Sequence, residues 1–230
     1  MKINYVFAPK VNELEEVFFF EPESVIDYLS TSRKENDILQ CPAFLDYYKN
    51  TYLIKAPIDI TLNISNSMIN CLQKLPADYL NMIVTNRFKE GDLHVTASLA
   101  WFYTFYSKES VMIEVIPPTW HKNTFQNNIN LIGATFDISK WVRPLEFAFE
   151  VIDDTKPLVI KRGDPLYYIR FNTLDKVKLI KQEPTKELEN LISMCSSVKA
   201  YSPKHNMQTN YSFMKKMIDK LKPKRCPFRW

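Results

Sequence analysis

Glycine is scarce, with only 3 among the 230 residues. A P-loop or a Rossmann dinucleotide fingerprint needs several glycines in one short loop, so both kinds of nucleotide site are excluded. Few glycines also mean few turns with positive φ and no glycine-rich backbone cradle for phosphate. By contrast, the chain has 15 Phe, 12 Tyr and 14 Pro, and aromatic residues favour pleated, half-buried strands. We therefore expect an α+β fold that is mostly β, with irregular connections.

Long apolar runs and paired cysteines are also missing. Without 18 consecutive apolar residues there is no transmembrane helix, and we expect no membrane association. We do not expect residues 1–20 to act as a signal peptide, because Pro9, Lys10 and Asn12 interrupt the apolar stretch. The four cysteines are dispersed and form no CxxC pair, which indicates free thiols in a reducing cytoplasm and no zinc site.

No catalytic constellation is visible. The histidines, His94, His121 and His205, stand in no HxH, HxD or HExxH pattern, so we predict no metal and no cofactor and expect each to be a structural or surface residue. There is no GxSxG nucleophile motif. Cys41 and Cys195 lie on apolar faces of expected helices, which favours buried core thiols over nucleophiles.

Charge is unevenly distributed along the chain. From Lys204 onward there are eight Lys or Arg against one acid, a net charge of +7, whereas the whole chain carries +4. Residues 183–230 are therefore predicted to form a basic helical appendage on a β-rich body of residues 1–182. A solvated amphipathic helix is the favoured interpretation, and nucleic-acid binding is the alternative. The basic residues named for that alternative are Lys215, Lys216, Lys220, Lys222, Lys224 and Arg225.

Periodicity and turn residues divide the chain into short elements. Helices are expected from Pro22, over 42–48, from Thr185 as N-cap, and over 211–221 with an apolar stripe that includes Phe213. Residues 120–130 are polar and rich in Asn, which is typical of a long loop. Strands are expected over residues 3–7, 17–20, 52–54, 58–64, 79–88, 93–106, 111–116, 145–151 and 176–181, and within the stretch 130–171.

The stretch 130–171 carries the clearest pattern in the chain. Gly133 leads to Asp137, an alternating apolar strand follows over 145–151, and a polar turn begins at Asp153. A short strand then reaches Gly163-Asp164 before a last apolar strand. From the residues alone, Asp137 is expected to cap N–H groups of its own turn, and Gly163 to supply a tight turn.

This stretch resembles the core hairpin of the dUTPase and dCTP-deaminase superfamily. The resemblance implies an antiparallel β-clip core, a trimer with sites between subunits, and a role for Asp137 in holding a sugar and orienting water. The upstream Arg-Ser phosphate-binding motif of the family is missing, and three further departures from the family pattern stand out. Gly133 lies one residue further from its Asp than in the family, residues 141–144 replace the base-stacking Tyr-x-Gly segment, and no glycine follows Gly163. A triphosphate site of that family is therefore lost or rebuilt.

Five residues of the stretch are candidates for a rebuilt nucleotide site. Trp141 and Tyr168, together with Trp120, offer rings for a base, while Lys161, Arg162 and Arg170 offer charge for phosphate. Alternation places Tyr168 and Arg170 on one face of their strand, opposite Tyr167 and Ile169. An aromatic core with an exposed basic edge accounts for the same residues and is the favoured interpretation.

Two functions follow from these patterns. The first is a non-enzymatic structural or interaction protein that binds protein partners or itself. Residues 41–50 and 141–144 resemble uncharacterised proteins of marine tailed bacteriophages and of some marine bacteria. That resemblance carries no activity, but it is compatible with a virion or accessory component in the virion or the host cytoplasm. The alternative is a nucleotide-binding or nucleotide-hydrolysing protein with a remodelled dUTPase-like site.

Overall fold

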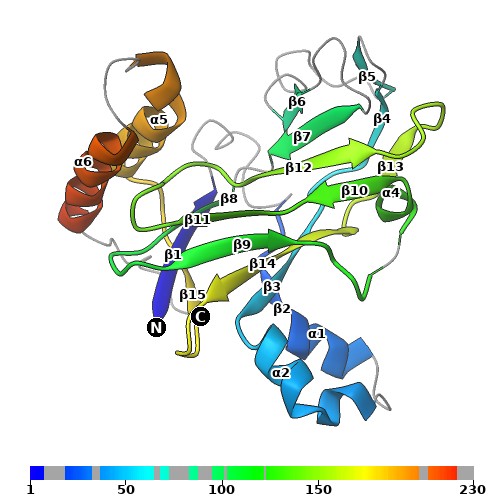
Figure 1. Ribbon diagram of the computed structural model, residues 1–230, viewed down its shortest axis with the longest axis horizontal. Coiled ribbons are helices and arrows are strands. Elements are labelled where there is room, and N and C mark those ends of the chain that lie inside the picture. Colours follow the sequence, from blue (N-terminus) through cyan, green and yellow to red (C-terminus); the bar gives the residue numbers. More distant parts are fainter. Residues whose placement is uncertain are drawn as a thin grey trace.

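The protein was analysed as a computed structural model, which describes residues 1–7, 19–32, 37–64, 68–72, 83–87, 95–100, 103–121, 123–201 and 207–221. Within these residues the chain folds into four small sheets with helices at two ends of the β body (Figure 1). The predicted class, α+β and mostly β with antiparallel strands, is confirmed.

Two sheets form the centre of the molecule, and every strand pair in them is antiparallel. The larger has the order β11 (Ala134–Asp137), β9 (Met112–Ile116), β14 (Pro165–Asn172), β3 (Thr51–Lys55) and β2 (Glu23–Ser24). The other has the order β10 (Ile129–Ile132), β12 (Glu146–Val151), β7 (Thr96–Ala100) and β6 (Val84–Asn86).

Two three-stranded sheets flank this centre. One has the order β13 (Leu158–Ile160), β4 (Ile60–Ile64) and β5 (Ile69–Cys71). The other has the order β15 (Lys178–Lys181), β1 (Lys2–Phe7) and β8 (Tyr103–Tyr106). In it β1 runs parallel to β15, and this is the one parallel pair among the strands described. This pair brings the first and the last strand of the β body side by side.

The helices gather at opposite ends of the β body (Figure 1). At one end lie α1 (Val25–Ser32), the 3₁₀ helix η2 (Asp37–Gln40) and α2 (Pro42–Tyr48). At the other end lie α5 (Lys186–Tyr201) and α6 (Met207–Lys220). A single helical turn, α4 (Thr124–Asn127), precedes β10.

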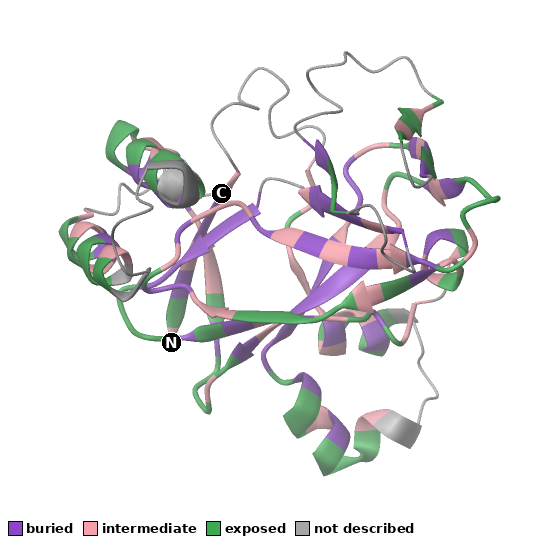
Figure 2. Cartoon of the chain, turned by 45° about the horizontal axis from the view of Figure 1, so that its top comes forward, coloured by how far each residue is buried: buried purple, intermediate pink, exposed green. Residues whose placement is uncertain are grey.

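The main core lies between the sheets, and β14 borders it. Tyr167, Ile169 and Phe171 belong to this core, whereas Tyr168 points to the opposite face and packs against α1 and α2. All four side chains are at most 1 % exposed. The predicted alternation is therefore confirmed, with both faces of β14 covered. Figure 2 shows the buried segments concentrated in the strands and the exposed ones on the outer turns of the helices.

The helical pair α5–α6 packs onto the β body through a second core. Its apolar residues meet Val6, Tyr106 and Val142 of the body. Thr185 caps α5 as predicted, since its Oγ1 accepts from the N–H of Leu188 at 3.2 Å. The helix residues in this core are Leu188, Leu191, Ile192, Cys195, Met214 and Ile218. Phe213 is half-exposed, so its predicted place in the buried stripe of α6 is wrong.

Two predictions of local structure are corrected. The helix expected from Pro22 begins three residues later, because Glu23 and Ser24 pair with β3 and Ser24 then accepts the Asp27 N–H at 3.3 Å. Residues 120–130 are not a continuous loop. Asn123 caps α4 through the Gln126 N–H at 2.8 Å, and β10 follows directly.

The strands within residues 130–171 do not pair with one another as a single hairpin would. Within 130–171, β10 pairs with β12, but β11 pairs with β9, β13 with β4, and β14 with both β3 and β9. The strand predicted over 93–106 is divided between β7 and β8, which belong to different sheets. Of the strand expected over 17–20, residues 17–18 lie outside the described residues and residues 19–20 are not in a strand. Of the strand expected over 79–88, the structure describes residues 83–87, which contain β6.

Candidate functional site

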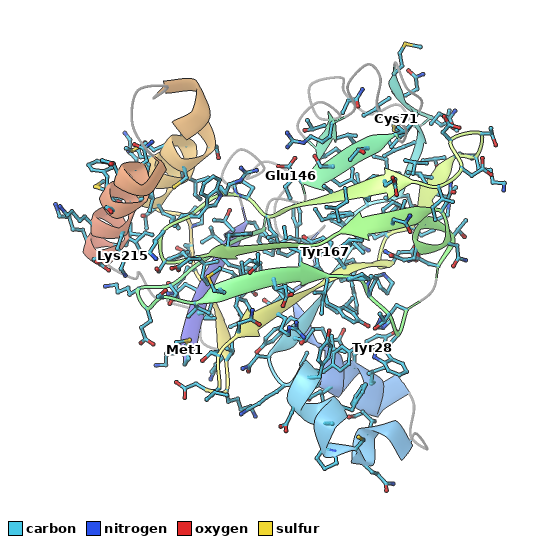
Figure 3. All side chains as sticks on the ribbon, in the orientation of Figure 1. Met1, Tyr28, Cys71, Glu146, Tyr167 and Lys215 are labelled. Carbon is cyan, nitrogen blue, oxygen red and sulfur yellow. The ribbon has the colours of Figure 1, made fainter. Side chains whose placement is uncertain are left out.

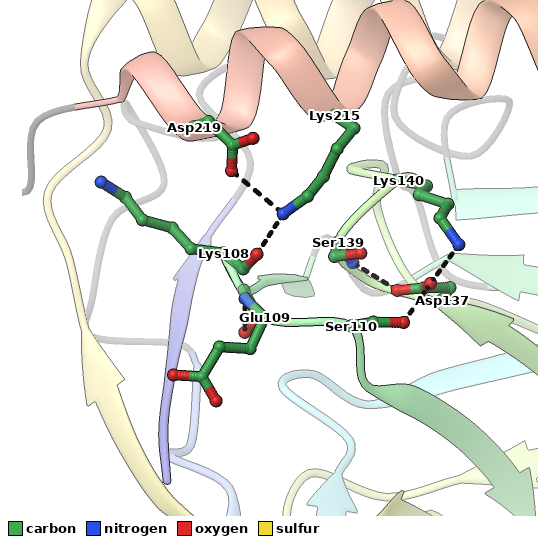
Figure 4. A network of polar contacts seen from close by, with 9 residues as sticks. Lys108, Glu109, Ser110, Asp137, Ser139, Lys140, Lys215 and Asp219 are labelled. Carbon is green, nitrogen blue, oxygen red and sulfur yellow. Dashed lines mark hydrogen bonds and ion pairs between the residues drawn. The ribbon is translucent and has the colours of Figure 1, made fainter.

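Asp137 occupies a turn at the end of β11, and its carboxylate is held from several sides (Figure 4). Oδ1 accepts the Ser139 backbone N–H at 2.9 Å, Oδ2 accepts the Ser110 hydroxyl at 2.7 Å, and Lys140 Nζ lies 2.8 Å from Oδ2. Burial would raise the pKa of this carboxyl, but these contacts outweigh it and hold the pKa at about 2. So acidic a carboxyl is a poor general base at neutral pH. The predicted capping role is confirmed.

The basic helix meets the body close to this turn. Lys215 Nζ donates to the Lys108 carbonyl oxygen and to Asp219 at 3.0 Å (Figure 4). Lys215 is thereby anchored, whereas Lys216 and Lys220 are exposed on α6. The other residues named for the basic tail, Lys222, Lys224 and Arg225, lie outside the described residues. His94 and His205 also lie outside them.

Trp141 lies at a charged cluster. The Arg143 guanidinium lies 5.4 Å from its ring and binds Glu146 Oε2 at 2.7 Å, while Arg87 and Ser98 bind Oε1 of the same carboxylate. Burial would raise the Glu146 pKa, but the hydrogen bonds from Ser98 and Arg87 and the positive charges of Arg87 and Arg143 lower it below its usual range. Glu146 lies in the body and Tyr28 on a distant helix (Figure 3).

The turn before β14 holds Lys161 and Arg162. Gly163 has φ +87°, a conformation that residues with a Cβ rarely adopt, and this confirms its role as a tight-turn glycine. Asp164 Oδ2 accepts the Lys161 N–H at 2.8 Å. The Arg162 side chain donates to the Pro57 carbonyl at 3.1 Å and lies 5.0 Å from the Phe20 ring. The turn is therefore held by its own contacts.

Trp120 and His121 line a hollow of about 620 Å³ that we call the aromatic hollow. Behind its wall, the Tyr168 hydroxyl is 2.6 Å from His121 Nδ1, and the His121 ring lies 4.5 Å from that of Tyr28. The residues lining the hollow are Tyr28, Thr119, Trp120, His121, Asn123, Asp164 and Pro165. Of these residues, sequence reasoning named Trp120 as a base-stacking candidate but not Tyr28, because α1 reaches the hollow only through the tertiary fold. Tyr168 is fully buried and does not line the hollow, so its predicted role in stacking on a base is wrong.

Arg170 lines a second hollow of about 600 Å³, which we call the Leu174 hollow. Its guanidinium donates twice to Glu114, at 2.6 and 3.0 Å, and lies 4.4 Å from the Tyr47 ring. The lining residues are Asp46, Tyr47, Lys49, Asn50 and those from Arg170 to Leu174. The five candidate ligand residues are thus not brought together in one site: Trp141 and Arg170 lie apart from the turn that holds Lys161 and Arg162.

The loop that ends this hollow is fixed by one buried side chain. Asn50, 4 % exposed, donates to the carbonyls of Thr173 and Asp175 and accepts the Val177 N–H, each at 2.9 Å. Lys49 Nζ also donates to the Leu174 carbonyl at 2.8 Å. Yet the Leu174 side chain is 93 % exposed. A well-held loop therefore presents a bare leucine to solvent.

The cysteine predictions have mixed outcomes. Cys195 is buried in the core beneath α5, as expected, and burial raises its pKa to about 11, which keeps the thiol protonated. Cys41 is exposed instead. It directly precedes α2 as the N-cap residue rather than lying on the buried side of the helix, so its predicted place in the core is wrong.

No family model matches the chain, and no curated protein matches it. Among the residues that the structure describes, no three His, Cys, Asp or Glu side chains gather closely enough to hold a metal ion. Within the same residues, every helix is too short or too polar to cross a membrane.

Proposed function

We propose that this protein is a non-enzymatic structural or interaction protein that presents Leu174 to a protein partner. The observation that carries the proposal is the contrast between Leu174, 93 % exposed, and the loop beneath it, which Asn50 fixes with three hydrogen bonds. Binding through a loop that is already ordered loses little conformational entropy. Tyr47, half-exposed beside the same hollow, is of a residue type that often contributes most to interface affinity.

Other proposals extend this role. A β-clip core is supported by the positive-φ Gly163 before the last apolar strand and by the capping turn at Asp137. The resemblance of residues 41–50 to phage proteins falls on the proposed binding surface, because that segment contains α2 and one wall of the Leu174 hollow. A virion or accessory component that acts through this surface, in the host cytoplasm or the virion, fits both resemblances.

A photo-reactive residue in place of Leu174 tests the interaction role. We expect irradiation of expressing cells to yield a discrete cross-linked protein species, because the side chain at this position would lie within the interface. The matched control carries the same residue at Thr155, an exposed turn position on another part of the surface. Equal yields at the two positions would contradict the proposal.

The second candidate function is nucleotide binding at the aromatic hollow. It is favoured by one observation: Trp120, proposed to stack on a base, lines this hollow together with Asp164 of the turn that holds Lys161 and Arg162. A ligand that binds only the folded state raises the melting temperature. We expect one deoxynucleotide of a panel to do so, and Trp120→Ala to remove the effect. A panel without any shift would contradict this candidate.

A further inference from the structure

Leu174 protrudes next to the hollow that it helps to line. The hollow, about 600 Å³, is bounded on one side by the end of α2 and on the other by the last residues of β14. Its volume lies within the range of pockets that enclose small ligands, so a leucine side chain fits inside it. A protrusion and a hollow side by side on one surface are complementary to the same surface turned through a two-fold rotation.

The charges around the hollow have the same self-complementary character. Four exposed side chains border Leu174 or the hollow, two of each sign: Asp46 and Asp175, and Lys49 and Lys176. Arg170 adds no net charge, because Glu114 binds it at 2.6 Å. The patch is therefore neutral although the chain carries +4. Two copies can meet here without net repulsion, and opposite charges are available to face one another.

The loop is also prepared for such a contact. Its carbonyls are bound by Asn50 and Lys49, so its backbone needs no reordering when Leu174 is buried. The exposed side chain then leaves water on association, which is favourable for an apolar group. Each two-fold contact would bury this leucine twice, once from each copy.

We infer that the partner bound at this surface is a second copy of the chain, in a two-fold dimer in which Leu174 of each copy enters the Leu174 hollow of the other. This inference rests on the proposed function and names its partner. A dimer through this surface uses residues of α2, residues 49–50 that follow it, β14 and the loop after β14. The aromatic hollow and the basic helix stay free of the contact.

Sedimentation velocity of the purified chain over a wide concentration range provides the first test. We expect a monomer–dimer equilibrium in the unaltered protein and a dimer weakened about 30-fold or more by Leu174→Asp, the loss typical of a central interface residue. The matched control is Leu72→Asp, which places the same charge at another exposed leucine (61 %). Because Leu174 is exposed, the variant should keep its fold, which thermal unfolding checks.

Photo-cross-linking of the purified chain through position 174 provides the second test. Cross-links to residues 46–50 or 170–173 of a second copy would support the dimer. A monomer at all concentrations overturns the inference. If that monomer still forms cross-links to a different protein in cells, the proposed function stands and the second-copy inference alone fails. If position 174 gives no cross-link to any protein, both fail.

Discussion

Replacing Asn50 with Ala tests how the loop after β14 is held. The substitution leaves the carbonyls of Thr173 and Asp175 and the N–H of Val177 without their 2.9 Å partners. The two carbonyls lie in a surface loop that water can reach, so their loss is partly compensated. Val177 is 3 % exposed, so its N–H stays dry and bears the full cost of about 1–3 kcal/mol. We expect the free energy of unfolding to fall by about 2–4 kcal/mol in total.

Urea unfolding measures this loss. The midpoint should fall while the slope of free energy against urea stays constant, because the surface exposed on unfolding is unchanged. Hydrogen exchange gives a local readout, and the Val177 amide should exchange faster in the variant. Asn50→Asp keeps the acceptor for Val177 but turns a carboxylate toward two carbonyls, so it should be destabilised at least as much.

The matched control is Asn63→Ala, since Asn63 is exposed on β4 and surface substitutions usually change stability by less than about 0.5 kcal/mol. If Asn50→Ala lost no more stability than this control, the three hydrogen bonds would not hold the loop. The argument that Leu174 is presented on a rigid support would then be refuted.

Three further predictions concern the turns and a helix end. The Asp137 pKa is held at about 2 against an ordinary 3.8, so its contribution, about 1 kcal/mol after solvent screening, is full above about pH 5 and is lost as the pH falls through 3.8 toward 2. In acid unfolding Asp137→Asn should lack this part of the pH dependence, and an unchanged profile would contradict it. Gly163→Ala should lower the free energy of unfolding by about 1–2 kcal/mol, because φ is +87° at this position. Gly133→Ala is the control and should be near neutral, since an added Cβ would lie 3.5 Å from the Val115 carbonyl oxygen, an ordinary contact. Equal urea midpoints for the two variants would refute the strain argument. Thr185→Ala should lower the free energy of unfolding by about 1 kcal/mol, and Thr185→Ser should lower it much less, because serine keeps the capping hydroxyl. Thermal unfolding measures both losses, and equal losses for the two variants would argue against the cap.

Local features of the fold could be predicted from the sequence. The two faces of β14, the Thr185 cap and the buried side of α5 depend on neighbours within a few residues, and periodicity reports such neighbours directly. Asp137 and Gly163 were predictable for the same reason, because each acts within its own turn.

Strand partners could not be predicted in the same way. Whether β13 pairs with β14 or with β4 depends on residues about a hundred positions away, and no local pattern encodes that choice. The helix α1 begins later than predicted for a related reason: the pairing of Glu23 and Ser24 with β3 overrides the helix signal of Pro22. Tertiary contacts of this kind routinely outweigh propensity.

The candidate site was the least predictable part. Asn50 reads as a turn residue in the sequence, and nothing near it indicates that its side chain holds a loop 123 residues away. Tyr28 reaches the aromatic hollow from another distant segment. A surface leucine such as Leu174 becomes informative only when its exposure and the order of its backbone are seen together.

The parallel pairing of β1 with β15 also governs the order in which the molecule is assembled. Residues 2–5 lie beside residues 178–181, so β1 waits for its partner while most of the body is synthesised, roughly 10–30 s at ordinary rates of translation. Such distant contacts slow folding, and until they form β1 keeps one edge open to other chains. Because Val6 of β1 lies in the core beneath α5 and α6, this part of the core forms only after the two helices, which follow the β body in the chain, have been synthesised.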